Sequence, residues 1–492
     1  MNNNTSKKNS SSNAKGTAKQ EGRLKWWQLS LLGVAGTIGT GYFLGSSLAI
    51  SMGGPAVLIA YLLAAAGTYI VFDALAAMTA EQPEEGSFRS YAKKAFGGLA
   101  GFGSGWVYLF SELLIMGSQL TALSIFARFW LPAVPMWAFA AGFGLLGLVI
   151  VFFGNKGFDR VENVLAIIKM AAIVMFLVLA AALLAGWIHG GKYEPKVPSS
   201  YTAWFPSGWT GLWSSFIFAF YAYGGIEVLG IMSNRLEKPE EAPKAGKVML
   251  ITLAVVYGLS IGLAVTMVPL KAFNPKESPF VLALSSEHLA FVPHLFNGVL
   301  IVAGFSTMTA SLYAVASMIN TLAKEGDAPR LFAVKWKDKY PLYGLGLIAC
   351  GLIAAIITAL LLPGKVYEYI TTAAGLMLLY NWSFILLSSG RLVSSGRLGA
   401  VKRWIGLVLI AAAVSGTLFH ALSRPGFFIS LLLVSVIAIC GFIVEKRRAG
   451  REGSGQGDSS EREQPHHPYH PQRFRPDKPY RSKGIIRQKS RT

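Results

Sequence analysis

The chain has 492 residues, of which 53% are hydrophobic and 14% are charged, and its mean hydropathy is +0.47. Soluble globular proteins usually have about 25% charged residues, so this composition excludes that class and indicates a polytopic membrane protein. Membrane topology and contact with anionic lipids explain the net charge of +20, so we do not expect nucleic-acid binding. Cys350 and Cys440 lie in apolar stretches and predict no disulfide framework, metal site or cofactor.

Residues 1–25 are polar, and no apolar segment typical of a cleavable signal peptide precedes the first hydrophobic stretch. We predict a disordered cytoplasmic arm there. Residues 26–444 contain twelve apolar stretches near the length of about 20 residues that a spanning helix needs, and we predict an all-α transmembrane domain. The stretches are approximately 28–50, 54–80, 101–129, 132–153, 163–188, 209–233, 247–270, 293–323, 342–362, 366–389, 402–420 and 425–444.

The positions of Lys and Arg predict the orientation of these spans. With a cytoplasmic N-terminus, most of the 45 Lys and Arg residues fall in cytoplasmic segments and few fall in outer loops. We therefore predict a multi-pass protein of the plasma membrane with both termini in the cytoplasm.

Glycines interrupt the first apolar stretch at Gly36, Gly39 and Gly41 and the sixth at Gly224 and Gly225. Each glycine costs a helix about 1 kcal/mol relative to alanine, and irregular backbone at membrane depth is tolerated only inside protein or beside a water-filled cavity. Because these stretches begin two sets of five, the pattern is typical of an inverted-repeat transporter with its solute site at the breaks. A glycine pair can instead mark close helix packing.

Four charged residues lie well inside the predicted spans: Asp73, Glu112, Lys169 and Glu227. Ionisable residues at such depth are costly and are functional candidates by default. Lys169 lies about 9 Å from the cytoplasmic end of its helix, at about 1.5 Å per residue, so it either extends to the interface or acts inside the protein. Glu112 is either protonated or paired with Lys169, and Asp73 suits a structural or solvated role better than a functional one.

The C-terminal segment 445–492 is charged and glycine-spaced, then rich in Pro, His and Arg. Such composition buries too little apolar surface to fold, so we predict a disordered basic cytoplasmic tail. Its histidines His466, His467 and His470 could bind a transition metal, but a solvated tail is the favoured interpretation.

Six groups of residues form a series of motifs along the chain. They are Gly36–Gly41 with Phe43–Ser46 and Gly54–Pro55; Pro83–Phe88 with Tyr91–Ala92; Gly105–Tyr108; Phe129–Pro132; Gly224–Glu227 with Glu237–Pro239 and Pro243–Ala245; and Leu322–Pro329. In this order, over roughly residues 26–345, they resemble the amino acid–polyamine–organocation (APC) superfamily, and in particular its bacterial amino acid permeases.

This resemblance implies a LeuT-type fold: a 5+5 inverted repeat of ten helices with broken helices 1 and 6, plus two more helices. It also implies an α-amino acid site between the breaks. The amides near Thr40 and Gly41, with the Thr40 hydroxyl and the unwound backbone at Gly39, would hold the carboxylate. Carbonyls near Thr37, Tyr221 and Gly224 would receive the ammonium group. Tyr221 and Tyr223 would lie beside the side-chain pocket, although tyrosines in helices are as often core residues.

The resemblance further implies that Lys169 occupies the space that sodium fills in sodium-coupled relatives and exchanges a proton during transport. It also implies that Glu227 acts in the response to pH or in gating. Glu112 has no counterpart in the family pattern. Three positions depart from it, because Ala77, Gln119 and Ser317 stand where permeases usually or often carry a charged residue. These departures put the usual gating network and its coupling in doubt.

Taken together, the sequence and this resemblance predict uptake of a neutral amino acid by alternating access driven by protons. Short hydrophilic loops leave no room for a catalytic domain, so we do not expect an enzyme. Two alternatives stay open. One is a gradient-independent exchanger of amino acids or amines, and the other is an amino-acid-sensing membrane receptor that transports little or nothing.

Overall fold

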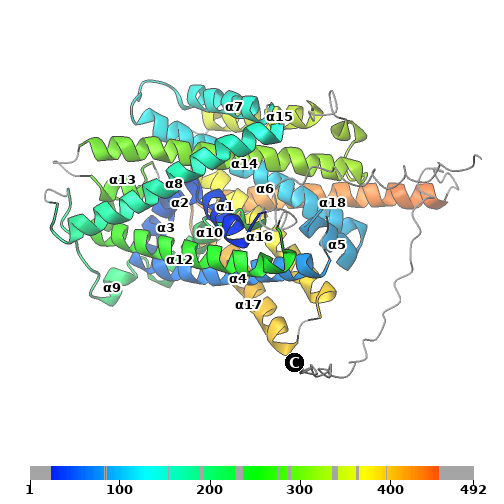
Figure 1. Cartoon of the computed structure of the whole chain (residues 1–492), viewed down its shortest axis with the longest axis horizontal. Helices are drawn as coiled ribbons and strands as arrows, with labels where there is room; N and C mark the ends of the chain where they lie inside the picture. The colour runs from blue at the N-terminus through cyan, green and yellow to red at the C-terminus, as the bar shows by residue number, and fades with distance from the viewer. Residues whose placement is uncertain are drawn as a thin grey trace, which may run out of the picture. The chain divides into compact units, whose positions relative to one another are not determined.

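The computed structural model describes residues 24–82, 84, 86–152, 154–188, 192–227, 236–274, 276–285, 290–334, 342–361, 365–394 and 396–453. Most of the predicted arm 1–25 and of the tail 445–492 lies outside this set. The chain divides into two units, Met1–Glu445 and Lys446–Thr492, and the fold below is that of the first (Figure 1). Its described residues are helical and contain no strand beyond an isolated bridge between Leu24 and Leu236.

The helices follow the predicted apolar stretches closely. They are α1 (Trp26–Thr37), α2 (Thr40–Phe43), α3 (Gly45–Gly53), α4 (Val57–Glu81), α5 (Phe88–Phe96), α6 (Gly98–Arg128), α7 (Met136–Phe152), α8 (Gly154–Leu184), α9 (Tyr201–Trp204), α10 (Gly208–Tyr221), α12 (Ala242–Met267), α13 (Pro279–Ala283), α14 (Phe291–Lys324), α15 (Leu342–Leu361), α16 (Val366–Leu392), α17 (Arg397–Gly416) and α18 (Arg424–Gly453). Short 3-10 turns occupy Gly54–Ala56, Pro239–Glu241, Leu270–Ala272 and Arg330–Ala333.

Eight helical segments among the described residues are long and apolar enough to cross a membrane, and the parts of α7 and α15 whose side chains are described, Met136–Val151 and Tyr343–Thr358, are shorter apolar segments. Four of the twelve predicted stretches therefore give no separate segment of that length. Two are those of α7 and α15, and a third is that of α10, which ends at Tyr221. The fourth is the first stretch, which is divided into α1 to α3, and α2 and α3 are counted together with α4 as Thr40–Glu81. The helices support a multi-pass membrane protein.

Burial separates inner helices from outer ones. In α6 and α16 most side chains are buried, and α6 packs against both α14 and α16. In α17, by contrast, large apolar side chains such as Leu398, Trp404 and Val408 are exposed, as expected of a helix that faces lipid. The core therefore surrounds α1, α10 and α16, which lie in the middle of the helices in Figure 1.

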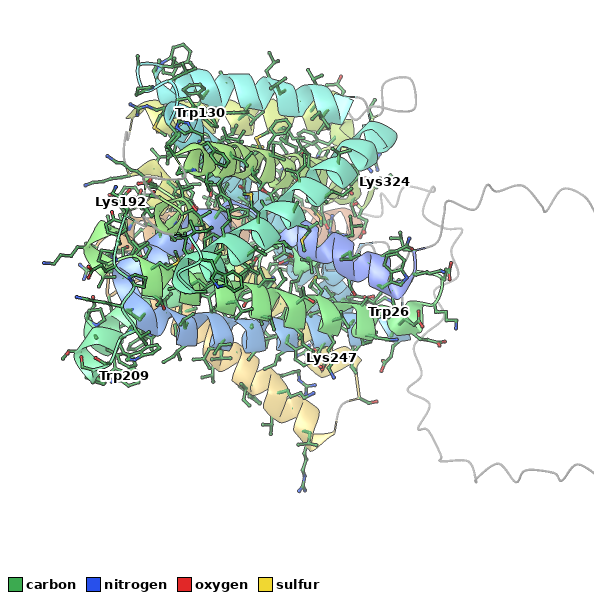
Figure 2. The ribbon with its side chains drawn as sticks, turned by 60° about the vertical axis from the view of Figure 1, so that its left-hand side comes forward. Trp26, Trp130, Lys192, Trp209, Lys247 and Lys324 are labelled. Atoms are coloured by element: carbon green, nitrogen blue, oxygen red, sulfur yellow. The ribbon has the colours of Figure 1, made fainter. Side chains whose placement is uncertain are left out.

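Tryptophan and lysine residues mark the two ends of the bundle (Figure 2). Trp26, Lys247 and Lys324 lie at one end, and Trp130, Lys192 and Trp209 lie at the opposite end. Amphipathic aromatic and basic side chains favour membrane interfaces. The first end carries the segments predicted to be cytoplasmic, so we call it the inner end and its opposite the outer end.

Candidate substrate site

The first helix break lies between Thr37 and Thr40. The N–H of Ile38 donates to the Val34 carbonyl and closes α1, after which Ile38 and Gly39 are extended, with φ/ψ of −72°/107° and −146°/−160°. A side-chain carbon on Gly39 would lie 2.6 Å from Cγ2 of Thr307. Glycine is therefore required here because α14 approaches the unwound backbone closely.

The beginning of α2 is held by α6 and α16. The backbone N–H of Thr40 donates to Oε1 of Gln119 over 3.4 Å, and the Thr40 hydroxyl donates to the same oxygen. The hydroxyl of Tyr367 donates to the Thr40 carbonyl over 3.0 Å. Gln119 thus places a neutral oxygen on two of the donors that the family resemblance predicts for a substrate carboxylate, the Thr40 amide and hydroxyl.

The second break follows Tyr221. The chain turns through Ala222 to Gly225, whose φ of +107° favours glycine. The Gly225 N–H donates to Oε2 of Glu227 over 3.0 Å, and Nε1 of Trp382 donates to Oε1 of Glu227. The Glu227 side chain is fully buried, and its two oxygens join the broken backbone to α16.

The two breaks contact each other. A side-chain carbon on Gly41 would lie 2.9 Å from the ring of Tyr221, and one on Gly225 would lie 3.7 Å from Oγ1 of Thr37. The hydroxyls of Tyr221 and Ser118 lie 3.1 Å apart, which fixes the Tyr221 ring against α6. Most of the predicted substrate residues, Thr37, Gly39, Thr40, Gly41, Tyr221 and Gly224, belong to these two adjoining segments.

Tyr223 points elsewhere. Its ring centroid lies 5.0 Å from that of Tyr257 on α12, and its hydroxyl donates to the Tyr61 carbonyl on α4 over 3.3 Å. The side chain is fully buried among these tyrosines. Of the two interpretations of Tyr223, this placement favours the core residue, and the aromatic wall beside the breaks is Tyr221.

Lys169 of α8 is fully buried and lies against the first break. Its Nζ donates to the Ala35 carbonyl over 2.6 Å and to Oγ of Ser306 over 2.7 Å. Ala35 is in the last turn of α1. In a continuous helix its carbonyl would accept a hydrogen bond from the N–H of Gly39, but Gly39 lies beyond the end of α1. The ammonium therefore binds a carbonyl that the break releases, and in this conformation the side chain does not extend to the interface.

Glu112 of α6 is buried and lies beside Tyr108 and Ser311. Sequence reasoning singled it out but missed Gln119, Ser118 and Tyr367 as contacts of the breaks. One signal was available for the first two. Ser118, Gln119 and Thr121 form a polar cluster in the middle of a largely apolar helix, and such a cluster inside a span indicates a polar interior.

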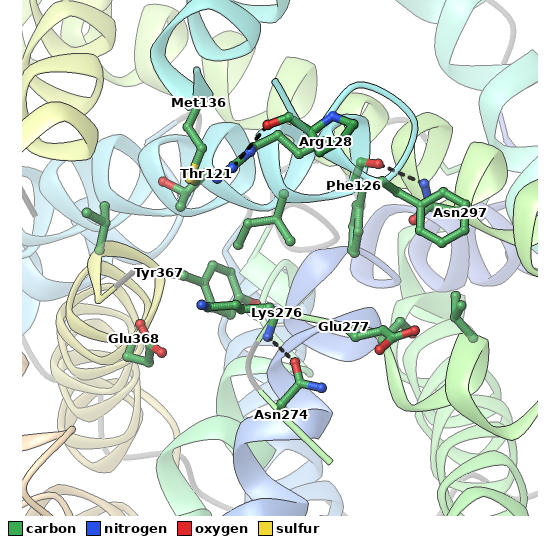
Figure 3. Close-up of a pocket in the computed structure, with 16 residues that line it drawn as sticks. Thr121, Phe126, Arg128, Met136, Asn274, Lys276, Glu277, Asn297, Tyr367 and Glu368 are labelled. Carbon is green, nitrogen blue, oxygen red and sulfur yellow. Dashed lines mark hydrogen bonds between the residues drawn. The ribbon is translucent and has the colours of Figure 1, made fainter. Parts of the chain in front are cut away.

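A cavity of about 560 Å³ lies at the outer end of the bundle (Figure 3). The ends of α6 and α13 and the beginnings of α7, α14 and α16 line it, with the segment before α13. Its lining residues are Thr121, Ile125, Phe126, Arg128, Phe129, Pro132, Met136, Asn274, Lys276, Glu277, Ser278, Val281, Asn297, Val366, Tyr367 and Glu368. Tyr367 connects the cavity with the breaks, because it also donates to the Thr40 carbonyl.

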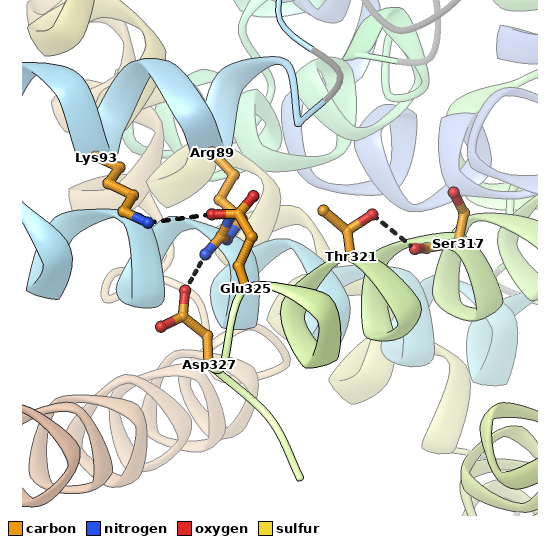
Figure 4. Close-up of polar contacts among 6 residues, drawn as sticks. All are labelled: Arg89, Lys93, Ser317, Thr321, Glu325 and Asp327. Atoms are coloured by element: carbon orange, nitrogen blue, oxygen red, sulfur yellow. Dashed lines mark hydrogen bonds and ion pairs between the residues drawn. The ribbon is translucent and has the colours of Figure 1, made fainter. Parts of the chain in front are cut away.

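Ion pairs tie α5 to the end of α14 at the inner end (Figure 4). Arg89 is fully buried and pairs with Asp327 and, over 2.5 Å, with Oε1 of Glu325. Lys93 pairs with the other oxygen of Glu325 over 3.2 Å. Ser317, two turns before Glu325, is exposed and accepts a hydrogen bond from Thr321 at its carbonyl. The Arg89 network therefore joins two segments that flank the bundle's inner end.

The chain belongs to the amino acid permease family, whose model matches residues 28–446. It is 52% identical to the uncharacterized transporter YcgH of Bacillus subtilis over 88% of this chain and 97% of that one. It is 29% identical to the aromatic amino acid transport protein AroP of Salmonella typhimurium, over 87% of this chain and 96% of that one. These matches confirm the resemblance to bacterial amino acid permeases of the APC superfamily and identify the chain as an amino acid transporter.

Proposed function

We propose that this transporter takes up a neutral amino acid across the plasma membrane by alternating access coupled to protons. The observation that carries the proposal is the meeting of the two helix breaks beside a buried ammonium group. Gly41 abuts the Tyr221 ring, and Lys169 donates to the Ala35 carbonyl at the end of α1.

In this proposal the fold is a LeuT-type 5+5 repeat of twelve spans with cytoplasmic termini. The amides and hydroxyl at Thr40 and Gly41 hold the substrate carboxylate once the Gln119 side chain rotates away. Carbonyls at Thr37, Tyr221 and Gly224 receive the ammonium group. A broken helix supplies both kinds of group, because its ends leave N–H and C=O groups without intrahelical partners.

Lys169 is the proposed proton-coupling residue. When charged, its ammonium group holds the Ala35 carbonyl and Ser306 at distances of 2.6 and 2.7 Å. Loss of a proton would weaken both hydrogen bonds and free α1 to move against α8 and α14. Glu227 would hold the second break to α16 through Trp382, and Glu112 is a further candidate for proton transfer.

The conformation suggests an outward-facing state that is closed at the substrate site. A cavity is present at the outer end, while Arg89 and its acidic partners tie the inner end. Tyr367 lies between the cavity and the breaks. Opening to the cytoplasm would then require the Arg89 ion pairs to separate.

Two features support a neutral substrate. The residues of the two breaks bring no acidic side chain other than Glu227, which Trp382 and the Gly225 amide already bind, and the Tyr221 ring supplies an apolar wall. The relative AroP is named for aromatic amino acids, which favours that subset.

A thermal-shift screen of the purified protein against the twenty amino acids tests the substrate. A ligand present at about 100 times its Kd stabilises the folded state by about 2.7 kcal/mol. We expect aromatic or branched aliphatic amino acids to give the largest rise in Tm. A larger rise with lysine or glutamate than with every neutral amino acid would contradict the proposed substrate class.

A further inference from the structure

Four buried tyrosines form a cluster beside the two helix breaks. They are Tyr42 of α2, Tyr61 of α4, Tyr223 of the second break and Tyr257 of α12, and each is at most 1% exposed. The ring centroid of Tyr257 lies 4.3 Å from that of Tyr42 and 5.0 Å from that of Tyr223. Its distance to the ring centroid of Tyr61 is 6.0 Å. Tyr257 therefore lies at the centre of the cluster, although α12 contributes no residue to either break.

The hydroxyl of Tyr257 binds the second break. It donates to the Ala222 carbonyl over 2.9 Å. Ala222 is the C-cap of α10, and a helix end leaves its last carbonyls without partners inside the helix. Since a buried carbonyl without a hydrogen bond is costly, this contact fixes the point at which the chain leaves α10.

The same part of α12 also binds the helix that follows the first break. The ring of Tyr42, two residues after Thr40, stacks on the Tyr257 ring with an angle of 12° between their planes. The Tyr42 hydroxyl donates to Oγ of Ser260 over 2.6 Å, and Ser260 lies about one helical turn after Tyr257. Two residues on one turn of α12 thus hold α2 and the second break at a fixed separation.

This separation matters because the two breaks hold the two charged groups of the substrate in the proposed function. The first break would hold the carboxylate at Thr40 and Gly41, and the second would receive the ammonium group at Tyr221 and Gly224. The groups of a binding site must be held within about 0.5 Å of their working geometry. A β-amino acid has one more carbon between its amino and carboxyl groups than an α-amino acid, which adds a bond of about 1.5 Å. A fixed separation would therefore favour α-amino acids over β-amino acids.

We propose that Tyr257 is a positioning residue that fixes the separation of the two breaks and so determines the selectivity of the site for α-amino acids over β-amino acids. The inference rests on the proposed function, in which the breaks hold the carboxylate and the ammonium group. Tyr257 acts through the Ala222 carbonyl and the Tyr42 ring and does not contact the substrate. Without its hydroxyl, the turn after α10 can shift against α2, and the site accepts a wider range of separations.

Competition binding to the full chain in lipid nanodiscs tests this proposal. Radiolabelled L-phenylalanine is displaced by unlabelled L-phenylalanine or by β-homophenylalanine, which has the same side chain, and L-leucine with β-homoleucine forms a second pair. The selectivity ratio is the Kd of the β-amino acid divided by the Kd of the matching α-amino acid, and for the parent protein we expect about tenfold or more with at least one pair.

Tyr257→Phe keeps the ring and removes the hydroxyl. It should lower the selectivity ratio about fivefold, which is about 1 kcal/mol at about 1.4 kcal/mol per tenfold and is the usual net contribution of one hydrogen bond. Tyr42→Phe should lower the ratio in the same direction, because it removes the hydrogen bond to Ser260. If Tyr257→Phe does not fold, the ratio of Tyr42→Phe decides the test.

Tyr61→Phe is the matched control. The Tyr61 hydroxyl is buried in the same cluster and has no hydrogen-bond partner among the described residues, so its removal should leave the selectivity ratio unchanged. An unchanged ratio in Tyr257→Phe, which includes an equal loss of affinity for both members of a pair, would overturn the positioning role and leave the proposed function standing. The same holds if the parent binds both members equally, or if Tyr61→Phe lowers the ratio as much as Tyr257→Phe does. Failure of the parent to bind either L-amino acid would overturn both proposals.

Discussion

Replacing Asp327 with alanine should destabilise the protein by about 3 kcal/mol. Arg89 and the Asp327 side chain are 0% and 3% exposed, and removing one partner of a buried ion pair typically costs about 3–5 kcal/mol, since the other charge stays buried. The lower value applies because Glu325, whose side chain is 31% exposed, still contacts Arg89 over 2.5 Å. Lys93→Ala is the control: its side chain is 46% exposed, and such surface pairs contribute about 0–1 kcal/mol.

The free energy of unfolding can be measured by titration with SDS in mixed micelles, followed by circular dichroism. Arg89→Ala combined with Asp327→Ala should cost less than the sum of the single variants, because the double variant leaves no unpaired buried charge. An Asp327→Ala protein within 1 kcal/mol of the parent, or strict additivity in the double variant, would refute the reasoning about this ion network.

Three further predictions concern pH, the substrate site and coupling. Burial acts to raise the pKa of Glu325, but hydrogen bonds and charge from Arg89 and Lys93 outweigh burial and lower the pKa below 4.5. The stabilising contribution of Glu325 is therefore complete above pH 4.5 and is lost as the pH falls through the lowered pKa. When unfolding is measured against pH, this loss should be absent in Glu325→Gln. Gly41→Ala should weaken substrate binding at least tenfold, about 1.4 kcal/mol, because its Cβ would lie 2.9 Å from the Tyr221 ring, whereas Gly36→Ala, with no atom within 4 Å of its Cβ, should bind as the parent does. Lys169→Ala should bind substrate without accumulating it, and accumulation equal to the parent's in uptake assays would exclude the coupling role.

The helix breaks were predictable because their cause is local. Gly39 and Gly41 weaken a helix at the positions where they stand in the chain. In the structure, α1 ends at Thr37 and α2 begins at Thr40. The charge of Lys169 in an apolar stretch likewise predicted a choice between interface and interior. The sequence could not make that choice, since it depends on how α8 lies against α1 and α14.

The contacts across helices were not predictable. Tyr221 and Tyr223 are two residues apart where the chain leaves the helix, so their directions depend on the turn, and only the fold places Tyr223 against Tyr257. Gln119 and Tyr367 reach Thr40 from α6 and α16. Periodicity within one helix carries no information about which residue of another helix it faces.

Uptake into proteoliposomes with an imposed pH difference tests the central claim most directly. With the outside acidic by one pH unit and one proton per substrate, the gradient supplies about 1.4 kcal/mol and can sustain about a tenfold accumulation. We predict that L-phenylalanine accumulates inside under this gradient and that collapsing the gradient releases it. Uptake that ignores pH and requires an internal amino acid, or binding with no flux at all, would contradict proton-coupled transport.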